Sequence, residues 1–227
     1  MARTLPRLLK SALRRMHPDC SVSYAQEGED LVLARLLEGR AHGFYVDIGA
    51  HHPTRFSNTC FFYERGWRGI NVEPSPDAVE AFRRSRSRDT NLQAGVAEQP
   101  GSLTYFVFDD AALNTFDEKL KQERESNTPY RVVATSTVEV TRLDAILREH
   151  LPKGQRIDFL SIDVEGFDLQ VLRSNDWSAY RPAFVLVEAL DFSIDAADSH
   201  PIHKFMRGQR YALVAKTMNT LFYRALD

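Results

Sequence analysis

A single α/β domain on a doubly wound, mostly parallel sheet of seven strands is the fold that this sequence predicts. From residue 43 onward, short apolar runs rich in β-branched and aromatic residues alternate with stretches of helical period, a pattern typical of repeated βαβ units. The chain has 227 residues, which fits one such domain, and neither a linker sequence nor an internal repeat divides it.

The expected elements follow in order along the chain. The seven strands are Phe44–Ile48, Gly69–Val72, Asn91–Val96, Phe159–Ile162, Phe184–Val187, Tyr211–Ala215 and Leu221–Arg224. The helices between them are Ser57–Arg65, Pro76–Arg86, Arg142–His150 and Phe167–Ser174, and Pro76 suits a first helical turn. Only residues 216–220 join the last two strands, which should therefore form an antiparallel hairpin at the far edge of the sheet.

Two segments depart from this alternation. We expect residues 1–23 to be an N-terminal extension before a domain at 24–227, because leucines recur at near-helical spacing in residues 1–16 among five basic and no acidic side chains. Such a helix either docks through its leucines or rests on an anionic membrane surface. The polar segment 109–136 is either a mobile lid over a substrate or a solvated surface helix and loop.

Bulk composition excludes several classes of protein. A net charge of −2 excludes a basic surface that coats nucleic acid, and no apolar run approaches the ~20 residues needed to cross a bilayer. Cys20 and Cys60 lack the CxxC spacing of a zinc site and are too few for a disulfide framework. We therefore expect a cytoplasmic protein, with peripheral contact to the inner face of the membrane as an option for residues 1–16.

The segment YVDIGAHHP predicts a ligand-binding turn. An apolar strand ends at Asp47, and Gly49 permits a sharp turn that brings backbone close to a ligand. The sequence lacks GxGxxG, which counts against a pyrophosphate-containing dinucleotide. Glu73 ends the next strand 26 residues later. Each acid alone is readily explained as a helix cap, but together they favour a methionine-derived nucleoside, with one carboxylate near its amino group and one on its ribose hydroxyls.

A second acidic motif, SIDVEG, follows the fourth strand and should border the same crevice. We expect Asp163 to act as general base, with Glu165 holding substrate or cofactor, although Asp163 could instead cap the following helix. His51 is the second candidate base, because a neutral imidazole can accept a hydroxyl proton; the alternative is a structural histidine.

A magnesium site is the further option at this edge of the sheet. Asp163, Glu188 and Asp191 follow two neighbouring strands and offer the oxygen ligands that Mg²⁺ prefers. Carboxylates commonly end strands without any metal, so we predict that this option does not apply and that the protein holds no metal ion.

The motifs SYAQEGED, YVDIGAHHPTRFSNT, GWRGINVEPSP, VTRLDAIL, IDFLSIDVEG and FVLVEAL, in this order, resemble the FkbM family of methyltransferases. The resemblance covers residues 24–224 and implies a Rossmann-like class I fold, S-adenosylmethionine as methyl donor, and O-methylation, often of sugars in polysaccharide, lipopolysaccharide or natural-product pathways. By motif, it implies that the cofactor residues are Gln26, Asp47, Gly49, Asn58, Thr59 and Glu73. Pro53 departs from the DxGxxxG turn of many methyltransferases.

The expected partner is a small-molecule or glycan acceptor. Two other functions fit the same fold. One is a nicotinamide-dependent oxidoreductase, against which the missing glycine-rich turn argues, and the other is a non-catalytic binding or scaffold protein.

Overall fold

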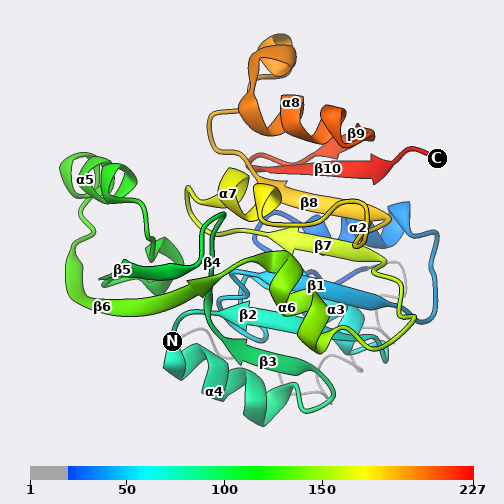
Figure 1. The fold of residues 1–227 in the computed structure, drawn as a ribbon, viewed down its shortest axis with the longest axis horizontal. Coiled ribbons are helices and arrows are strands. Elements are labelled where there is room, and N and C mark those ends of the chain that lie inside the picture. Colours follow the sequence, from blue (N-terminus) through cyan, green and yellow to red (C-terminus); the bar gives the residue numbers. More distant parts are fainter. Residues whose placement is uncertain (1–19) are drawn as a thin grey trace.

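The computed structural model describes residues 20–227, so the basic helix expected in residues 1–16 lies outside the described part of the chain (Figure 1). The main sheet has seven strands in the order β3-β2-β1-β7-β8-β10-β9. They are β1 (Phe44–Ile48), β2 (Arg68–Glu73), β3 (Thr90–Gln93), β7 (Phe159–Ile162), β8 (Phe184–Glu188), β9 (Tyr211–Lys216) and β10 (Thr220–Ala225). β10 is antiparallel to both neighbours, and the other pairs are parallel. The predicted fold class is confirmed.

Helices cover both faces of this sheet. Alternate side chains of β1 point to opposite faces, as the period of a strand requires. Tyr45 packs with Leu33 in a cluster formed with α2 (Glu29–Leu36) and α3 (Cys60–Tyr63). Val46 packs with Leu143 in a cluster formed with α6 (Leu143–His150), α7 (Asp168–Arg173) and α8 (Pro201–Gly208). The fold therefore has three layers with a hydrophobic core on each side of the sheet, and α4 (Pro76–Ser85) lies beside β2 and β3.

A second, three-stranded sheet was not predicted. It contains β4 (Gly95–Val96), β5 (Gly101–Phe108) and β6 (Val132–Thr141) in the order β4-β6-β5. The strand expected at 91–96 is correct for residues 91–93, which lie in β3, and wrong beyond them, because the chain leaves the main sheet at Ala94 and β4 joins the second sheet. A side chain on Gly95 would come within 2.6 Å of the Val140 side chain, so this glycine permits the close approach of β4 to β6.

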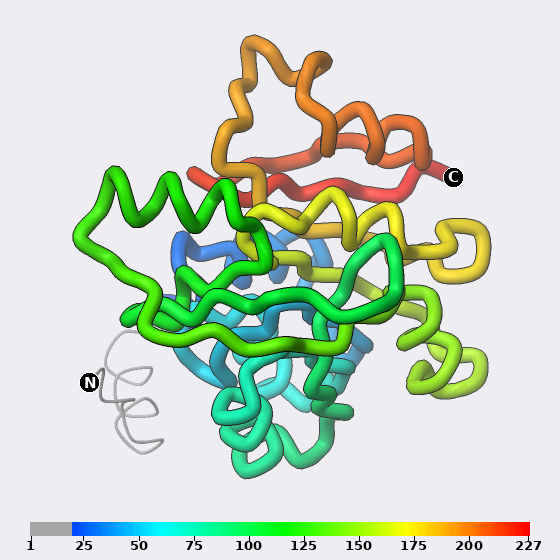
Figure 2. The backbone as a smooth tube through the Cα atoms, turned by 60° about the vertical axis from the view of Figure 1, so that its left-hand side comes forward, coloured from blue at the N-terminus to red at the C-terminus, as the bar shows by residue number. Residues whose placement is uncertain are grey.

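The segment between β5 and β6 lies across the carboxyl end of the main sheet (Figure 2). It contains η1 (Ala111–Leu113) and α5 (Glu118–Asn127). α5 buries none of its residues, as expected for a solvated surface helix. The same segment touches the predicted catalytic motif, because the Thr115 hydroxyl donates to the carbonyl of Glu165 at 2.7 Å. The polar segment is therefore both a surface helix and a cover for the edge where the strands end.

Two remaining features complete the fold. The short helix η2 (Ile194–Ser199) precedes α8 at the top of Figure 1. Within residues 20–227, no helix has both the length and the apolar character that crossing a bilayer requires. Cys20 and Cys60 are both free thiols, as their spacing predicts.

Candidate functional site

The turn after β1 brings two strand ends together. Gly49 has a φ of 77°, in the left-handed region that favours glycine. A side chain at this position would lie 1.8 Å from the carbonyl oxygen of Asp163, so only glycine allows the two backbones to approach this closely. The predicted turn is present, and it places the end of β1 against the end of β7.

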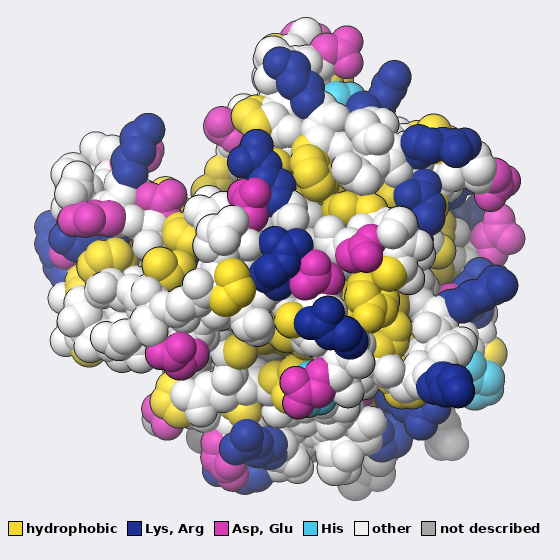
Figure 3. Space-filling model, in the orientation of Figure 1, with side chains coloured by type: hydrophobic (Ala, Val, Ile, Leu, Met, Phe, Trp, Pro, Cys, Tyr) yellow, Lys and Arg dark blue, Asp and Glu magenta, His cyan; other side chains and the backbone are white. Residues whose placement is uncertain are grey.

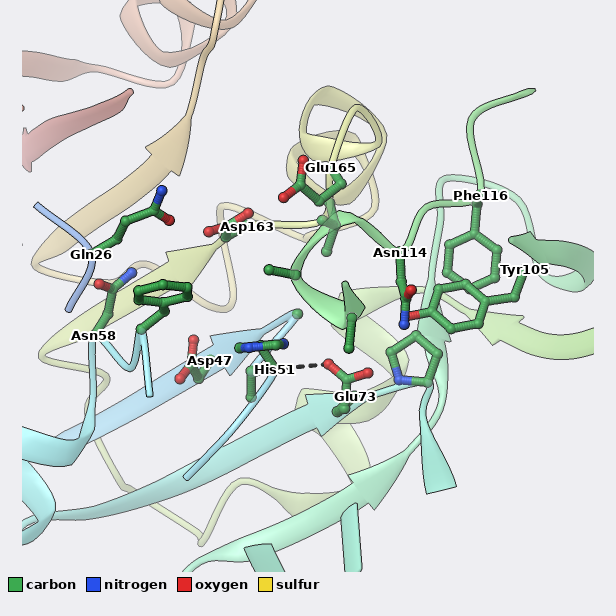
Figure 4. A pocket seen from close by; sticks show the side chains of 17 residues that line it. Gln26, Asp47, His51, Asn58, Glu73, Tyr105, Asn114, Phe116, Asp163 and Glu165 are labelled. Carbon is green, nitrogen blue, oxygen red and sulfur yellow. Dashed lines mark hydrogen bonds between the residues drawn. The ribbon is translucent and has the colours of Figure 1, made fainter. Parts of the chain in front are cut away.

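A pocket opens above this contact and contains most of the predicted site (Figure 4). The empty space within it, open solvent included, is about 710 Å³. Its lining includes Gln26, Asp47, Gly49, His51, Asn58, Glu73, Asp163 and Glu165. Thr59 is the exception among the predicted residues, because it is fully buried and does not line the pocket.

Thr59 acts on the pocket through Asp47. Its hydroxyl donates to the Asp47 carboxylate at 2.9 Å and accepts from the guanidinium of Arg86 at 3.2 Å. Burial raises the pKa of Asp47 to about 6, although the bond from Thr59 and the charge of Arg86 both oppose this rise. Arg86 also donates to the carbonyl of Pro53 at 2.9 Å, so one buried guanidinium holds both the loop after β1 and the carboxylate that ends the strand.

Glu73 is held by backbone groups on either side. One of its oxygens accepts from the amide of His51 and the other from the amide of Ser75, both at 2.9 Å. Burial raises the pKa of Glu73 to about 7. Each carboxylate oxygen has two lone pairs, so the group keeps the capacity to accept from further donors in the pocket.

His51 is neutral at physiological pH. Burial, aided by the charge of Arg55, lowers the pKa of His51 to about 4. Its Nε2 is buried and has no hydrogen-bond partner among residues 20–227. The backbone of His51 lies at a φ of 53°, which is uncommon for a residue other than glycine. The imidazole thus lines the pocket with an unshared nitrogen.

Three carboxyl groups meet at the ends of β7 and β8. One oxygen from each of Asp163, Glu165 and Glu188 lies within 4.8 Å of the others. Burial raises the pKa of Asp163 well above its ordinary value, and the negative charges of Glu165 and Asp168 raise it further. A carboxylate that is hard to ionise is a strong acceptor for a proton, which suits the role predicted for Asp163.

The acidic residues that could share a magnesium ion differ from the predicted set in one residue. Among residues 20–227, the acidic groups close enough to share an ion are Asp163, Glu165 and Glu188, and the expected third ligand, Asp191, is not among them. The carboxylate of Asp191 instead pairs with His200 at 2.9 Å. Glu165 also forms an ion pair with Arg124 of α5.

Several pocket residues were missed by sequence reasoning. Tyr105 of β5 and Asn114 and Phe116 of the segment after it line the pocket on the side of Glu73, across from Gln26 and Asn58 (Figure 4). Their contribution depends on the second sheet, for which the sequence offered only two strand-like runs. Arg86 was missed because it ends a run of exposed arginines and serines, and no periodicity distinguishes it from a surface residue.

The doubly wound sheet reverses its strand order between β1 and β7, and acidic residues follow both strands there. This arrangement is that of a Rossmann-like fold, in which ligands bind at the point where the strand order reverses. The methyltransferase FkbM domain matches residues 47–213, and the chain belongs to this family of methyltransferases. The predicted family is thereby confirmed, and the nicotinamide-dependent oxidoreductase loses its support.

Individual relatives are more distant. The chain is similar to methyltransferase sdnD of Sordaria araneosa, with 26% identity over 172 residues, 63% of this chain and 65% of that protein. It therefore spans less than two thirds of that relative. Two solved structures each have a TM-score of 0.45. One is 1,6-didemethyltoxoflavin-N1-methyltransferase of Burkholderia thailandensis with 1,6-didemethyltoxoflavin and S-adenosylhomocysteine, at 11% identity over 97% of this chain and 87% of that chain. The other is a methyltransferase of Geobacter sulfurreducens, at 13% identity over 100% and 93%.

The buried network around Arg86 should dominate the stability of the site. In Arg86→Met, the facing Asp89 loses its guanidinium at 3.6 Å and four oxygens lose a donor, so we expect a loss of about 3–5 kcal/mol in the free energy of unfolding. Guanidinium chloride unfolding followed by circular dichroism measures this. The control is Arg84→Met, whose exposed ion pair with Glu80 should contribute less than about 1 kcal/mol. Equal losses in the two variants would contradict the assignment.

Proposed function

We propose that this pocket binds S-adenosylmethionine and that the protein is an O-methyltransferase acting on a sugar hydroxyl in a polysaccharide, lipopolysaccharide or natural-product glycoside. The observation that carries the proposal is the meeting of three strand-end carboxyl groups in one pocket. Asp47 and Glu73 lie toward one end, and Asp163 lies beyond the turn at Gly49 (Figure 4). This arrangement separates a place for binding from a place for proton removal.

The chemistry of the donors and acceptors fits the cofactor. S-adenosylmethionine carries an ammonium group and two ribose hydroxyls, all of which donate hydrogen bonds, and the pocket offers the carboxyl groups of Asp47 and Glu73 as acceptors. Gln26 and Asn58 add amide groups that can donate to its carboxylate. When bound, the cofactor supplies a methyl group on a positively charged sulfur.

Asp163 is the proposed base. An acceptor hydroxyl that receives the methyl group on its oxygen must lose its proton, and the raised pKa of Asp163 gives this carboxylate the affinity to take it. His51 lines the same pocket with an unshared Nε2 and is the second candidate. Tyr105 and Phe116 cover the pocket from the insertion side, which limits water near the reacting atoms.

A hydroxyl acceptor fits the acidic character of the site. Transfer to an oxygen of a sugar requires proton removal, for which a carboxylate with a raised pKa is suited. Carboxylates also accept hydrogen bonds from the neighbouring hydroxyls of a sugar, which helps to orient one of them. Location in the cytoplasm remains a prediction from the cysteine content.

Cofactor binding tests the proposal directly. Wild-type protein should bind S-adenosylhomocysteine with micromolar affinity in isothermal titration, and Glu73→Ala should weaken it about 10- to 100-fold, because charged hydrogen bonds are worth about 1.5–3 kcal/mol. Glu80→Ala, on the exposed part of α4, is the matched control and should bind normally. NAD should not bind. A wild-type protein that binds no S-adenosylhomocysteine would refute the proposed cofactor site.

Turnover tests the base. Asp163→Asn keeps the size of the side chain but removes its capacity to take a proton, so kcat should fall by about 100-fold or more while S-adenosylhomocysteine affinity stays within several-fold. Transfer of a labelled methyl group to sugar glycosides measures this. Wild-type kcat in the variant would exclude Asp163 as the base and leave His51 as the remaining candidate.

The affinity for the cofactor should rise with pH. Donors on the cofactor favour the ionised forms of Asp47 and Glu73, whose pKa values are raised to about 6 and about 7, so protonation at low pH opposes binding. We expect the dissociation constant of S-adenosylhomocysteine to fall about tenfold or more from about pH 5 to about pH 8, since one linked proton changes it up to tenfold per pH unit. Titrations in Glu73→Gln should lose the upper part of this change. A flat profile in the wild type would contradict it.

A further inference from the structure

A second cavity lies beside the cofactor pocket. It spans about 1160 Å³ of space open to solvent and is walled by α5, the start of α7, the end of β8 and the start of α8. Figure 3 shows the molecule hollowed between the region of α5 and the region of α8. No residue that we have assigned to cofactor binding lines this cavity within the described part of the chain. It therefore has space for a second ligand.

The two cavities share the acidic cluster as a wall. Asp163 and Glu165 line the cofactor pocket, whereas Glu188 lines the second cavity. Oxygens of the three groups lie within 4.8 Å of one another. A ligand held at Glu188 is therefore close to the proposed base, Asp163.

This wall contains two buried polar atoms that make no hydrogen bond within the described part of the chain. One carboxyl oxygen of Glu188 and the Nδ1 of His200 are buried and have no hydrogen-bond partner within residues 20–227. His200 is only 9% exposed, and its other ring nitrogen is occupied by Asp191. Buried polar groups without partners are uncommon, so each indicates a group supplied from outside the described chain.

Acidic side chains predominate in the lining of the cavity. Its lining includes the carboxyl groups of Asp117, Glu123, Asp168, Glu188 and Asp191, against one lysine, Lys119. Burial and the negative charge of Asp163 raise the pKa of Glu188 to about 11, as expected for a carboxyl group whose close neighbours are acids. A cation placed beside Glu188 would relieve this repulsion, whereas an anion would add to it.

We propose that this cavity is the acceptor subsite and that it selects an acceptor with a protonated amine next to the hydroxyl that is methylated, as in a 2-amino sugar. This rests on the proposed function of the first pocket. The ammonium group lies against Glu188 and the hydroxyl against Asp163. Since these carboxyl oxygens are within 4.8 Å of each other, the amine and hydroxyl sit on neighbouring carbons. Phosphorylated sugars and uronates are rejected by the same charge.

Three methyl glycosides that share the same pyranose ring and differ in charge test the proposal. Full-length protein saturated with S-adenosylhomocysteine is titrated, with ligand-observed NMR, against methyl glucosaminide, its N-acetyl derivative and methyl glucuronide. We expect the amine to bind at least about tenfold more tightly than the neutral derivative and the uronate not to bind, because a paired charge is worth about 1.5–3 kcal/mol. Glu188→Gln should weaken the amine about tenfold and leave S-adenosylhomocysteine affinity unchanged. Asp195→Asn, an exposed residue of η2 outside the cavity, is the control and should bind all ligands as the wild type does.

Two other outcomes overturn the proposal, and a third bears on the cofactor site alone. Equal binding of the amine and the uronate, or no binding of the amine, shows that the cavity does not select a cationic acceptor. Saturable binding of MgCl₂ alone that Glu188→Gln abolishes, without binding of the amine, shows that the cluster takes a metal ion instead. Failure to load S-adenosylhomocysteine is a separate result, because it refutes the cofactor site and not the charge selection of the second cavity.

Discussion

The close approach of Gly49 to the backbone of Asp163 is the constraint on which the site depends. It occurs where the strand order reverses, so the turns after β1 and β7 diverge on either side of it and leave a crevice. Asp47 then lies on one flank and Asp163 on the other, on strands that pair directly. The separation of the group proposed to bind the cofactor from the proposed base is therefore set by the sheet itself, and not by the loops that surround the pocket.

This geometry brings several buried carboxyl groups together. Two arginines, Arg86 and Arg124, partly offset their negative charge. Arg86 approaches from beneath through Thr59 and lowers the pKa of Asp47 relative to what burial alone would give. Arg124 approaches from α5 and pairs with Glu165. Asp163 and Glu188 keep raised pKa values despite these arginines. Acidity remains uncompensated at the boundary between the two cavities, which is where a reaction needs a proton acceptor.

The sequence predicted what depends on strand ends and failed where the result depends on tertiary packing. Asp47, Glu73 and Asp163 each follow an apolar run, so the parallel sheet alone predicts that they meet. Thr59 was placed in the pocket by resemblance, but it is buried behind Asp47, which no local pattern reveals. The break at Ala94 was missed because an apolar run reads the same whether it stays in one sheet or passes to another.

The insertion between β5 and β6 explains how one fold could serve different acceptors. Its residues Asn114 and Phe116 line the first pocket, while Asp117 and Glu123 line the second cavity, so a single segment borders both. The edge of the main sheet must keep its glycine and acids, because the backbone contact and the cofactor both depend on them. Apart from Arg124, which pairs with Glu165, the surface residues of α5 carry no such requirement. Changes of charge on α5 can therefore alter which acceptor enters while the core of the sheet and the base stay in place.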